Sequence, residues 1–108
     1  MNRVFRALSD PTRRRVLQLL RERPVSAGEL SAHFPVSKPT MSAHFSVLQE
    51  AGLIEAERAG RTIIYRLKMS VLEDALLGFV QTFGGQIEGA RRLGTSGAKR
   101  RLARRREA

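Results

Sequence analysis

The sequence predicts a mainly α-helical α+β domain with about five helices and one two-stranded β-hairpin. Two observations carry this prediction. Apolar residues recur at helical spacing in five separate segments, each bounded by Ser, Asp, Pro or Gly. Residues 62–67 instead alternate, with Ile63, Tyr65 and Leu67 on one face, which is typical of a half-buried strand. A chain of 108 residues is long enough for one domain.

The composition narrows the function classes. The chain has no cysteine, which excludes disulfides, thiol nucleophiles and cysteine-ligated zinc. It has no apolar run of the roughly 18–20 residues that span a bilayer, and its N-terminus lacks the apolar stretch of a signal peptide. With 20 Lys and Arg against 10 Asp and Glu, its surface should attract polyanions, most often nucleic acid. We therefore expect a small, soluble, cytoplasmic, basic protein.

The positive charge is concentrated at the C-terminus. Residues 85–108 hold 8 of the 20 basic residues but only 2 of the 10 acidic ones, with few large apolar side chains. Such a segment buries too little apolar surface to offset its ordering entropy. We expect a folded domain over residues 1–84 and a flexible basic tail over 85–108.

The first half of the chain predicts three helices. Residues 2–8 form a short first helix, and a second covers residues 12–23, with Asp10 as its N-cap and Pro11 at its first position. Ser26 and Glu29 fit a capping box, in which each side chain satisfies the other residue's backbone N–H, at the start of a third helix that ends at Pro35.

A fourth helix is predicted from about residue 38 to 51, with Ser37 as its cap and Gly52 as its stop. Met41, Phe45 and Leu48 share one apolar face, which is most simply a core face. The opposite face of the first two turns is small and polar, whereas a merely solvated helix would usually carry bulky charged residues there. His44 lies at the edge of the buried face, where packing or hydrogen bonding is the simpler role and a phosphate contact is the alternative.

The second half predicts a hairpin and a last helix. Strands over residues 53–58 and 62–67 are joined by Ala59-Gly60-Arg61, and Tyr65 should be partly buried with its hydroxyl free to reach a phosphate. Ser70 should cap a helix over residues 71–83, and Gly84-Gly85 should end it.

This order of elements is that of a winged helix-turn-helix flanked by terminal helices. Its fourth helix is the one that would enter a major groove, about 12 Å wide. The hairpin is the wing, whose Arg58 and Arg61 can reach phosphates or a narrow minor groove. Arg13 and Arg14, near the start of the second helix, are further candidates for phosphate contacts, and a solvated helix face is the alternative.

Three segments carry a resemblance to a known family: LSDPTRRRVLQLL (8–20), SKPTMSAHFSVLQEAGLI (37–54) and ERAGRTIIYRL (57–67). Over roughly residues 1–82 the chain resembles the ArsR family of bacterial winged-helix repressors, and most of all its autorepressor (SdpR-like) subgroup. The resemblance implies a homodimer built from the first and last helices, bound to an inverted-repeat operator on double-stranded DNA and repressing transcription.

The resemblance also implies site residues. Recognition-helix contacts fall on Ser37, Lys38, Pro39, Thr40, Ser42 and Ala43, and wing contacts on Arg58, Arg61 and Thr62. An isologous dimer would use Phe5 of the first helix and Leu76, Phe79, Val80 and Phe83 of the last, since these apolar residues are many for one small monomer.

The chain departs from the family at the metal sites. Many members sense metals through Cys in the third helix or through His and carboxylates on the last helix. Here the third helix reads GELSAHF and the last contains no His, while His33 and His44 lie on different helices. Converging ligands are not evident, so we expect no metal and no cofactor. Release from DNA would then depend on a regulatory protein partner, a small ligand or protein concentration.

Two other functions stay open at this point. The basic tail could dominate, which would give a sequence-tolerant nucleic-acid or nucleoid-binding protein. The winged domain could instead be a dimeric scaffold for protein contacts. An enzyme is not expected, because the sequence has no nucleophile–base pair at plausible spacing and no phosphate-cradling glycine loop.

Overall fold

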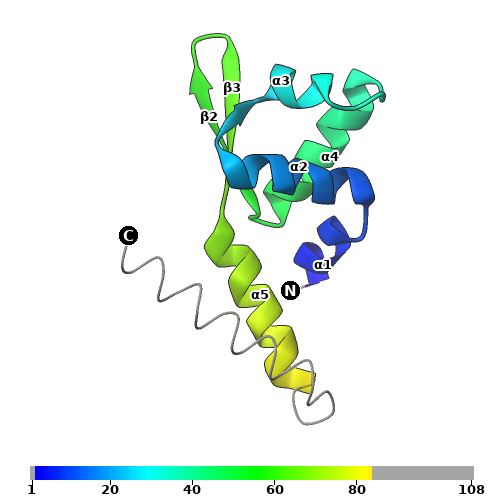
Figure 1. The fold of residues 1–108 in the computed structure, drawn as a ribbon, viewed down its shortest axis with the longest axis vertical. Coiled ribbons are helices and arrows are strands. Elements are labelled where there is room, and N and C mark those ends of the chain that lie inside the picture. The colour runs from blue at the N-terminus through cyan, green and yellow to red at the C-terminus, as the bar shows by residue number, and fades with distance from the viewer. Residues whose placement is uncertain (1, 84–108) are drawn as a thin grey trace. The chain divides into compact units, whose positions relative to one another are not determined.

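The computed structural model describes residues 2–83 and confirms the winged helix-turn-helix. Its elements, shown in Figure 1, are α1 (Asn2–Leu8), α2 (Pro11–Glu22), β1 (Val25–Ser26), α3 (Ala27–Ala32), α4 (Lys38–Glu50), β2 (Ile54–Ala59), β3 (Thr62–Leu67) and α5 (Met69–Phe83). The chain divides into two units, residues 1–72 and 73–108, so α5 begins in the first unit and continues in the second. The predicted tail, residues 85–108, lies outside the described residues.

The sheet has three strands, one more than the sequence predicts. The strand order is β1-β3-β2, with both pairs antiparallel, and Val25 lies opposite Tyr65 in the β1–β3 pair. A two-residue strand is too short to show an alternating pattern, so periodicity alone could not find it. Its effect is to join the base of the wing to the start of α3.

The core of the first unit is the space between the helices and the base of the sheet. Its most deeply buried large side chains come from α2, α3, α4 and the segment that leads into β2; they are Val16, Leu30, Met41, Leu48 and Leu53. The predicted apolar face of α4 is confirmed, since Met41, Phe45 and Leu48 are all at most 5% exposed. Burial of this face fixes which side of α4 points to solvent.

Caps define most helix ends. The Asp10 carboxylate accepts the backbone N–H of Arg13 at 3.0 Å, which confirms the predicted start of α2. Gly52 has φ of +76° and its N–H donates to the carbonyl of Gln49 at 2.9 Å, just beyond the end of α4. This left-handed conformation is one that glycine adopts without steric cost.

The predicted capping box is only half formed. The Ser26 hydroxyl accepts the backbone N–H of Glu29 at 3.1 Å, as expected. The Glu29 carboxylate, however, pairs with the guanidinium of Arg23 instead of reaching back to Ser26. An exposed carboxylate gains more from a charged partner than from a neutral N–H, which explains the difference.

Several boundaries differ from the sequence prediction. Strand β2 covers Ile54–Ala59 rather than 53–58, and Ala59 pairs with Thr62, so the turn has two residues and not three. Helix α3 ends at Ala32, three residues before Pro35, because the N–H groups of His33 and Phe34 turn back to the carbonyls of Leu30 and Ser31. Helix α5 begins at Met69, so Ser70 lies inside the helix and is not its cap.

Tyr65 connects the wing to α4. Its ring centroid lies 4.7 Å from that of Phe45, and the residue is 6% exposed, so its ring is buried; the predicted phosphate contact of its hydroxyl stays a prediction. Burial raises the pKa of the Tyr65 phenol above its ordinary value of 10.0. The aromatic pair holds β3 against the buried face of α4.

Replacement of Leu48 by Ala tests this packing. Leu48 is fully buried, so Leu48→Ala should lower the free energy of unfolding by about 2–5 kcal/mol through lost burial and the cavity left behind. Val36→Ala is the matched control, because Val36 is 40% exposed and its loss should cost at most about 0.5 kcal/mol. Urea unfolding followed by circular dichroism measures both, and equal losses would contradict the assigned core.

Candidate nucleic-acid interface

The N-terminal half of α4 presents an open, mostly small-residue surface. Ser37 caps the helix: its hydroxyl oxygen accepts the backbone N–H of Thr40 at 3.3 Å. The Ser37 hydroxyl also donates to the Thr40 hydroxyl at 2.8 Å, which orders the two side chains together. All six residues that the sequence predicts as base or backbone contacts on this helix are exposed, namely Ser37, Lys38, Pro39, Thr40, Ser42 and Ala43.

This end of α4 suits an anionic partner. The first N–H groups of a helix have no intrahelical acceptor, and the helix dipole places partial positive charge there. Lys38 adds a full positive charge at the first helical position. Small side chains allow the helix backbone to approach a surface closely. The arrangement fits a groove lined by phosphates and hydrogen-bonding base edges.

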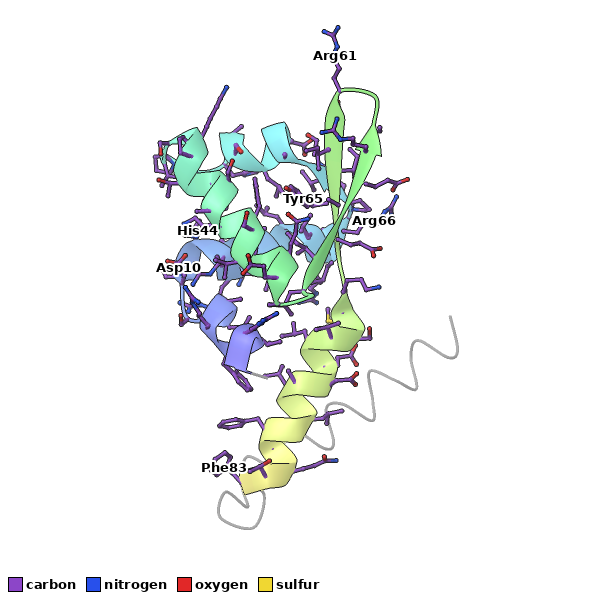
Figure 2. The ribbon with its side chains drawn as sticks, turned by 180° about the vertical axis from the view of Figure 1, so that it is seen from behind. Asp10, His44, Arg61, Tyr65, Arg66 and Phe83 are labelled. Carbon is purple, nitrogen blue, oxygen red and sulfur yellow. The ribbon has the colours of Figure 1, made fainter. Side chains whose placement is uncertain are left out.

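The wing carries the second predicted cluster. Gly60 has φ of +64° and, with Arg61, forms the turn between the paired residues Ala59 and Thr62. Arg61 extends from the tip of the wing, away from the helices (Figure 2). Within residues 2–83, neither Arg58 nor Arg61 forms an ion pair. Their guanidinium groups are therefore available for an outside anion.

The wing also carries neutralised charges. Arg66 donates two hydrogen bonds to the Glu57 carboxylate, both at 3.1 Å, and the Lys68 ammonium lies 3.6 Å from the Glu55 carboxylate. Because all four side chains are well exposed, these pairs add little to stability. Their main effect is to neutralise two carboxylates beside a surface that would otherwise repel an anion.

Arg13 and Arg14 lie near the start of α2, but much of their hydrogen-bonding capacity is used internally. The Nε and Nη2 groups of Arg13 donate to the carbonyls of Ala7 and Arg6, at 2.8 and 3.0 Å. Arg14 donates to the carbonyl of Leu8 at 2.8 Å. The predicted phosphate contacts of both residues stay untested predictions, and the structure gives each a second task, which is to hold the end of α1.

A polar cluster beside these residues was not found from the sequence. Arg13 Nη1 lies 3.2 Å from His44 Nδ1, and His44 Nδ1 lies 3.9 Å from an Asp10 carboxylate oxygen. The three residues come from α4, from α2 and from its N-cap, and Figure 2 shows His44 close to Asp10. The available signals were the Asp10-Pro11 cap and the position of His44 at the edge of a buried face.

The dimer residues predicted from sequence fall in both units. In α5, Leu76, Phe79 and Phe83 are 39–45% exposed, Val80 is half-buried, and the rings of Phe79 and Phe83 lie 4.9 Å apart. Phe5 of α1, in the first unit, is half-buried. Leu77 is a further large apolar residue, 37% exposed, beside the predicted set.

Within residues 2–83, no group of three or more His, Asp or Glu side chains is placed to hold a metal ion, and His33 and His44 share no such group. None of the helices in this part of the chain has the length and apolar character needed to cross a bilayer.

Comparisons with known proteins decide the family. A family described as "Helix-turn-helix domain" matches residues 8–57. The transcriptional repressor SdpR of Bacillus subtilis (strain 168) is 45% identical over 76 residues, which cover 70% of this chain and 84% of the relative. The crystal structure of an ArsR family transcriptional regulator aligns with a TM-score of 0.68 at 30% identity, over 79% of this chain and 90% of that one.

The chain belongs to the ArsR family. A second relative is the HTH-type transcriptional regulator CmtR of Mycobacterium tuberculosis (strain ATCC 25618 / H37Rv). It is 40% identical over 79 residues, which cover 73% of this chain and 67% of the relative. The family assignment agrees with the order of elements, in which α3 and α4 form the helix-turn-helix and β2 and β3 form the wing. The chain is therefore a DNA-binding transcriptional regulator.

Acid should weaken the joint at Asp10. Burial opposes ionisation of this carboxyl, but the hydrogen bond from the N–H of Arg13 and the electrostatic effects of the His44 and Arg13 side chains outweigh it and hold the pKa of Asp10 below 3.8. A carboxyl whose pKa is lower in the folded state stabilises the fold above its unfolded pKa, and this stability is lost as pH falls below 3.8 through the folded pKa.

An Asp with a lowered pKa loses its contribution to stability progressively between about pH 5 and pH 2. Asp10→Asn should therefore make the unfolding free energy decline less steeply over this pH range. Urea unfolding at several pH values measures this, and a carboxyl ¹³C titration of the wild-type protein gives the pKa directly. A midpoint for Asp10 above 3.8 would contradict the assigned contacts.

Proposed function

We propose that this protein is a homodimeric repressor that binds an inverted-repeat operator in a sequence-specific manner. The observation that carries the proposal is the surface formed by α4. Its apolar face is buried, and the outward face of its first two turns carries exposed, mostly small side chains beside the positive end of the helix dipole. Because SdpR is named a transcriptional repressor, its 45% identity supports repression as the outcome of binding.

We assign direct base readout to α4. The Thr40 and Ser42 hydroxyls can donate to and accept from base edges, while the Ala43 methyl group can contact a thymine methyl. The Lys38 ammonium and the Lys38 backbone N–H suit a phosphate oxygen, because Pro39 has no N–H and that of Thr40 is bonded to Ser37. Ser37 and Pro39 shape the first turn, so the backbone itself approaches the groove.

We assign to the wing the contacts that fix the position of the protein along the DNA duplex. Arg58 and Arg61 carry charge without an internal partner in the described structure, and Thr62 lies directly beside the turn. Phosphate contacts of this kind fix orientation on the duplex, and an arginine at a wing tip also suits a narrow minor groove. Arg13 and Arg14 could contact phosphates only through the guanidinium N–H groups that are not already bonded to carbonyls of α1.

A dimer accounts for the apolar surface of α5. Leu76, Leu77 and Phe83 are large side chains with 37–45% exposure, and a second copy of the chain would cover them. Two-fold symmetry would then present two α4 helices to successive major grooves, about 34–36 Å apart. Phe5, Phe79 and Val80 complete the proposed interface.

The remaining parts of the proposal are coarser. We place the protein in the bacterial cytoplasm, on nucleoid DNA, with no cofactor, no metal and no catalytic role. A regulatory protein partner is the favoured means of release from the operator. Sequence-tolerant binding driven by the basic residues is the competing function, and the experiment below separates the two.

A negative charge introduced into the proposed interface should weaken specific binding. An operator is first selected from a random duplex pool, and affinities are then measured for this operator and for a shuffled duplex. Ser42→Glu and Arg61→Glu should each weaken operator binding by about tenfold or more, since each well-placed contact is worth about 1–3 kcal/mol. The controls are Gln18→Glu and Arg21→Glu on α2, which change the net charge equally.

The salt dependence gives a second readout of the same variants. Arg61→Ala should reduce the slope of log affinity against log salt by about 1 for each protomer that loses a phosphate contact. If the wild-type protein binds operator and shuffled duplex equally at physiological salt, the sequence-specific function fails and the sequence-tolerant one stands. Effects of the α2 controls as large as those of the interface variants would also contradict the assignment.

The dimer is tested by sedimentation. Wild-type protein at micromolar concentration should sediment as a dimer, and Leu76→Glu should shift it to the monomer because an uncompensated carboxylate enters an apolar interface. Glu73→Gln is a control on the first turns of the same helix and should leave the mass unchanged. A monomeric wild-type protein at working concentrations would end the proposal of paired recognition helices.

A further inference from the structure

We propose that Arg13 is a positioning residue that couples α1 to the recognition helix by fixing His44 in one tautomer, with its proton on Nε2. This inference deepens the proposed function, since it assumes that α4 reads DNA. It concerns residues of the first unit only, and it assigns Arg13 a task other than the phosphate contact predicted from sequence.

Arg13 closes the C-terminal end of α1. The last carbonyls of a helix have no intrahelical donor. The Ala7 carbonyl accepts a hydrogen bond from Arg13 Nε, and the Arg6 carbonyl accepts one from Arg13 Nη2 in addition to those from the N–H and hydroxyl of Ser9. A guanidinium suits this position because its donors form a rigid planar fork that binds two acceptors at once. The backbone of Arg13 is itself held, because its N–H donates to the Asp10 cap.

The third guanidinium nitrogen reaches the recognition helix. Arg13 Nη1 lies 3.2 Å from Nδ1 of His44, which is the seventh residue of α4. A guanidinium has five N–H donors and no acceptor, so in this contact the histidine nitrogen must accept. A neutral histidine that accepts at Nδ1 carries its proton on Nε2. The position of the Arg13 guanidinium, which can only donate, therefore favours the Nε2–H tautomer of His44.

Asp10 lies beside the contact between Arg13 and His44. Its carboxylate accepts the N–H of Arg13 at 3.0 Å and lies 3.9 Å from His44 Nδ1, which is too long for a hydrogen bond. His44 thus faces a guanidinium within hydrogen-bond distance and a carboxylate just outside it. Its side chain is 15% exposed, so water competes little for Nδ1.

The consequence is a direct mechanical link between two helices with different proposed tasks. His44 follows Ala43 and lies one turn beyond Thr40, so any change in its position also moves the surface proposed to read bases. Arg13 ties that position to the last turn of α1, whose Phe5 belongs to the proposed dimer interface. A shift of α1 on dimer rearrangement would therefore alter how α4 meets the groove.

Two side-chain substitutions of His44 separate this role from simple packing. His44→Asn keeps a hydrogen-bond acceptor near the position of Nδ1, whereas His44→Gln places its amide near the position of Nε2. Both are neutral, polar and similar in size. We expect His44→Asn to bind the selected operator within about threefold of wild type and His44→Gln to bind at least tenfold more weakly, the factor that 1.4 kcal/mol represents.

The spectroscopic test needs no DNA. In the full-length protein, long-range ¹H–¹⁵N correlation spectra of the imidazole should show His44 as the Nε2–H tautomer. In Arg13→Gln the pattern should change to a mixture of tautomers, whereas Arg21→Gln, an exposed α2 control, should leave it unchanged. This readout remains interpretable even if a His44 variant fails to fold.

The outcomes distinguish the alternatives. An Nδ1–H tautomer in the wild-type protein, or equal operator affinity for the Asn and Gln variants, overturns the inference. It is also overturned if Arg13→Gln weakens shuffled and operator DNA equally and lowers the salt slope by about 1, since that is the signature of a phosphate contact alone. If the tautomer result holds but no operator is found, the link stands and the proposed function fails.

Discussion

The structure depends on how one helix, α4, is held at the surface. Met41, Phe45 and Leu48 point into the core, and this fixes the roll of the helix so that residues 37–40, 42 and 43 face solvent. At about 25 cal/mol per Å² of apolar surface removed from water, three such side chains supply several kcal/mol. Each exposed ion pair of residues 2–83 contributes far less, at most about 1 kcal/mol. The exposed turns can therefore consist of small polar residues that contribute little to stability.

The wing and the terminal helix α1 are oriented by contacts to the same helix. Tyr65 of β3 stacks against Phe45, which connects the wing to the buried face of α4. Arg13 connects the last turn of α1 to His44 on the edge of α4. One apolar contact and one polar contact thus fix two surfaces relative to the recognition helix, and a change at either contact would reach the DNA-binding surface.

Charge is sorted within the described structure rather than spread evenly. Arg13 and Arg14 bond to carbonyls at the end of α1, and Arg66 and Lys68 neutralise carboxylates of the wing. Lys38, Arg58 and Arg61, on α4 and the wing, form no ion pair within residues 2–83, and neither do Arg3, Arg6, Arg15 and Arg21 on α1 and α2. A count of basic residues therefore overstates the binding surface, because some are paired with carboxylates and others belong to α1 and α2.

Sequence patterns were sufficient where a repeating physical preference acts over many residues. The apolar face of α4, the Asp10 and Ser37 caps and the alternation in β3 were all predictable, because each follows from helical or strand periodicity or from an unpaired N–H at a helix start. The two-residue strand β1 and the Glu29–Arg23 pair were not, because each depends on which segments meet in space. The link between Arg13 and His44 spans 31 positions and was hidden for the same reason.

The most direct test of the central claim is a guanine methylation interference experiment on the selected operator, since methylation at N7 blocks contacts in the major groove. Paired presentation of α4 predicts two clusters of interference on one face of the duplex, centred about 10–10.5 base pairs apart or at a multiple of that spacing. Interference confined to one cluster, or absent while binding persists, would contradict an account in which two exposed α4 helices read the DNA.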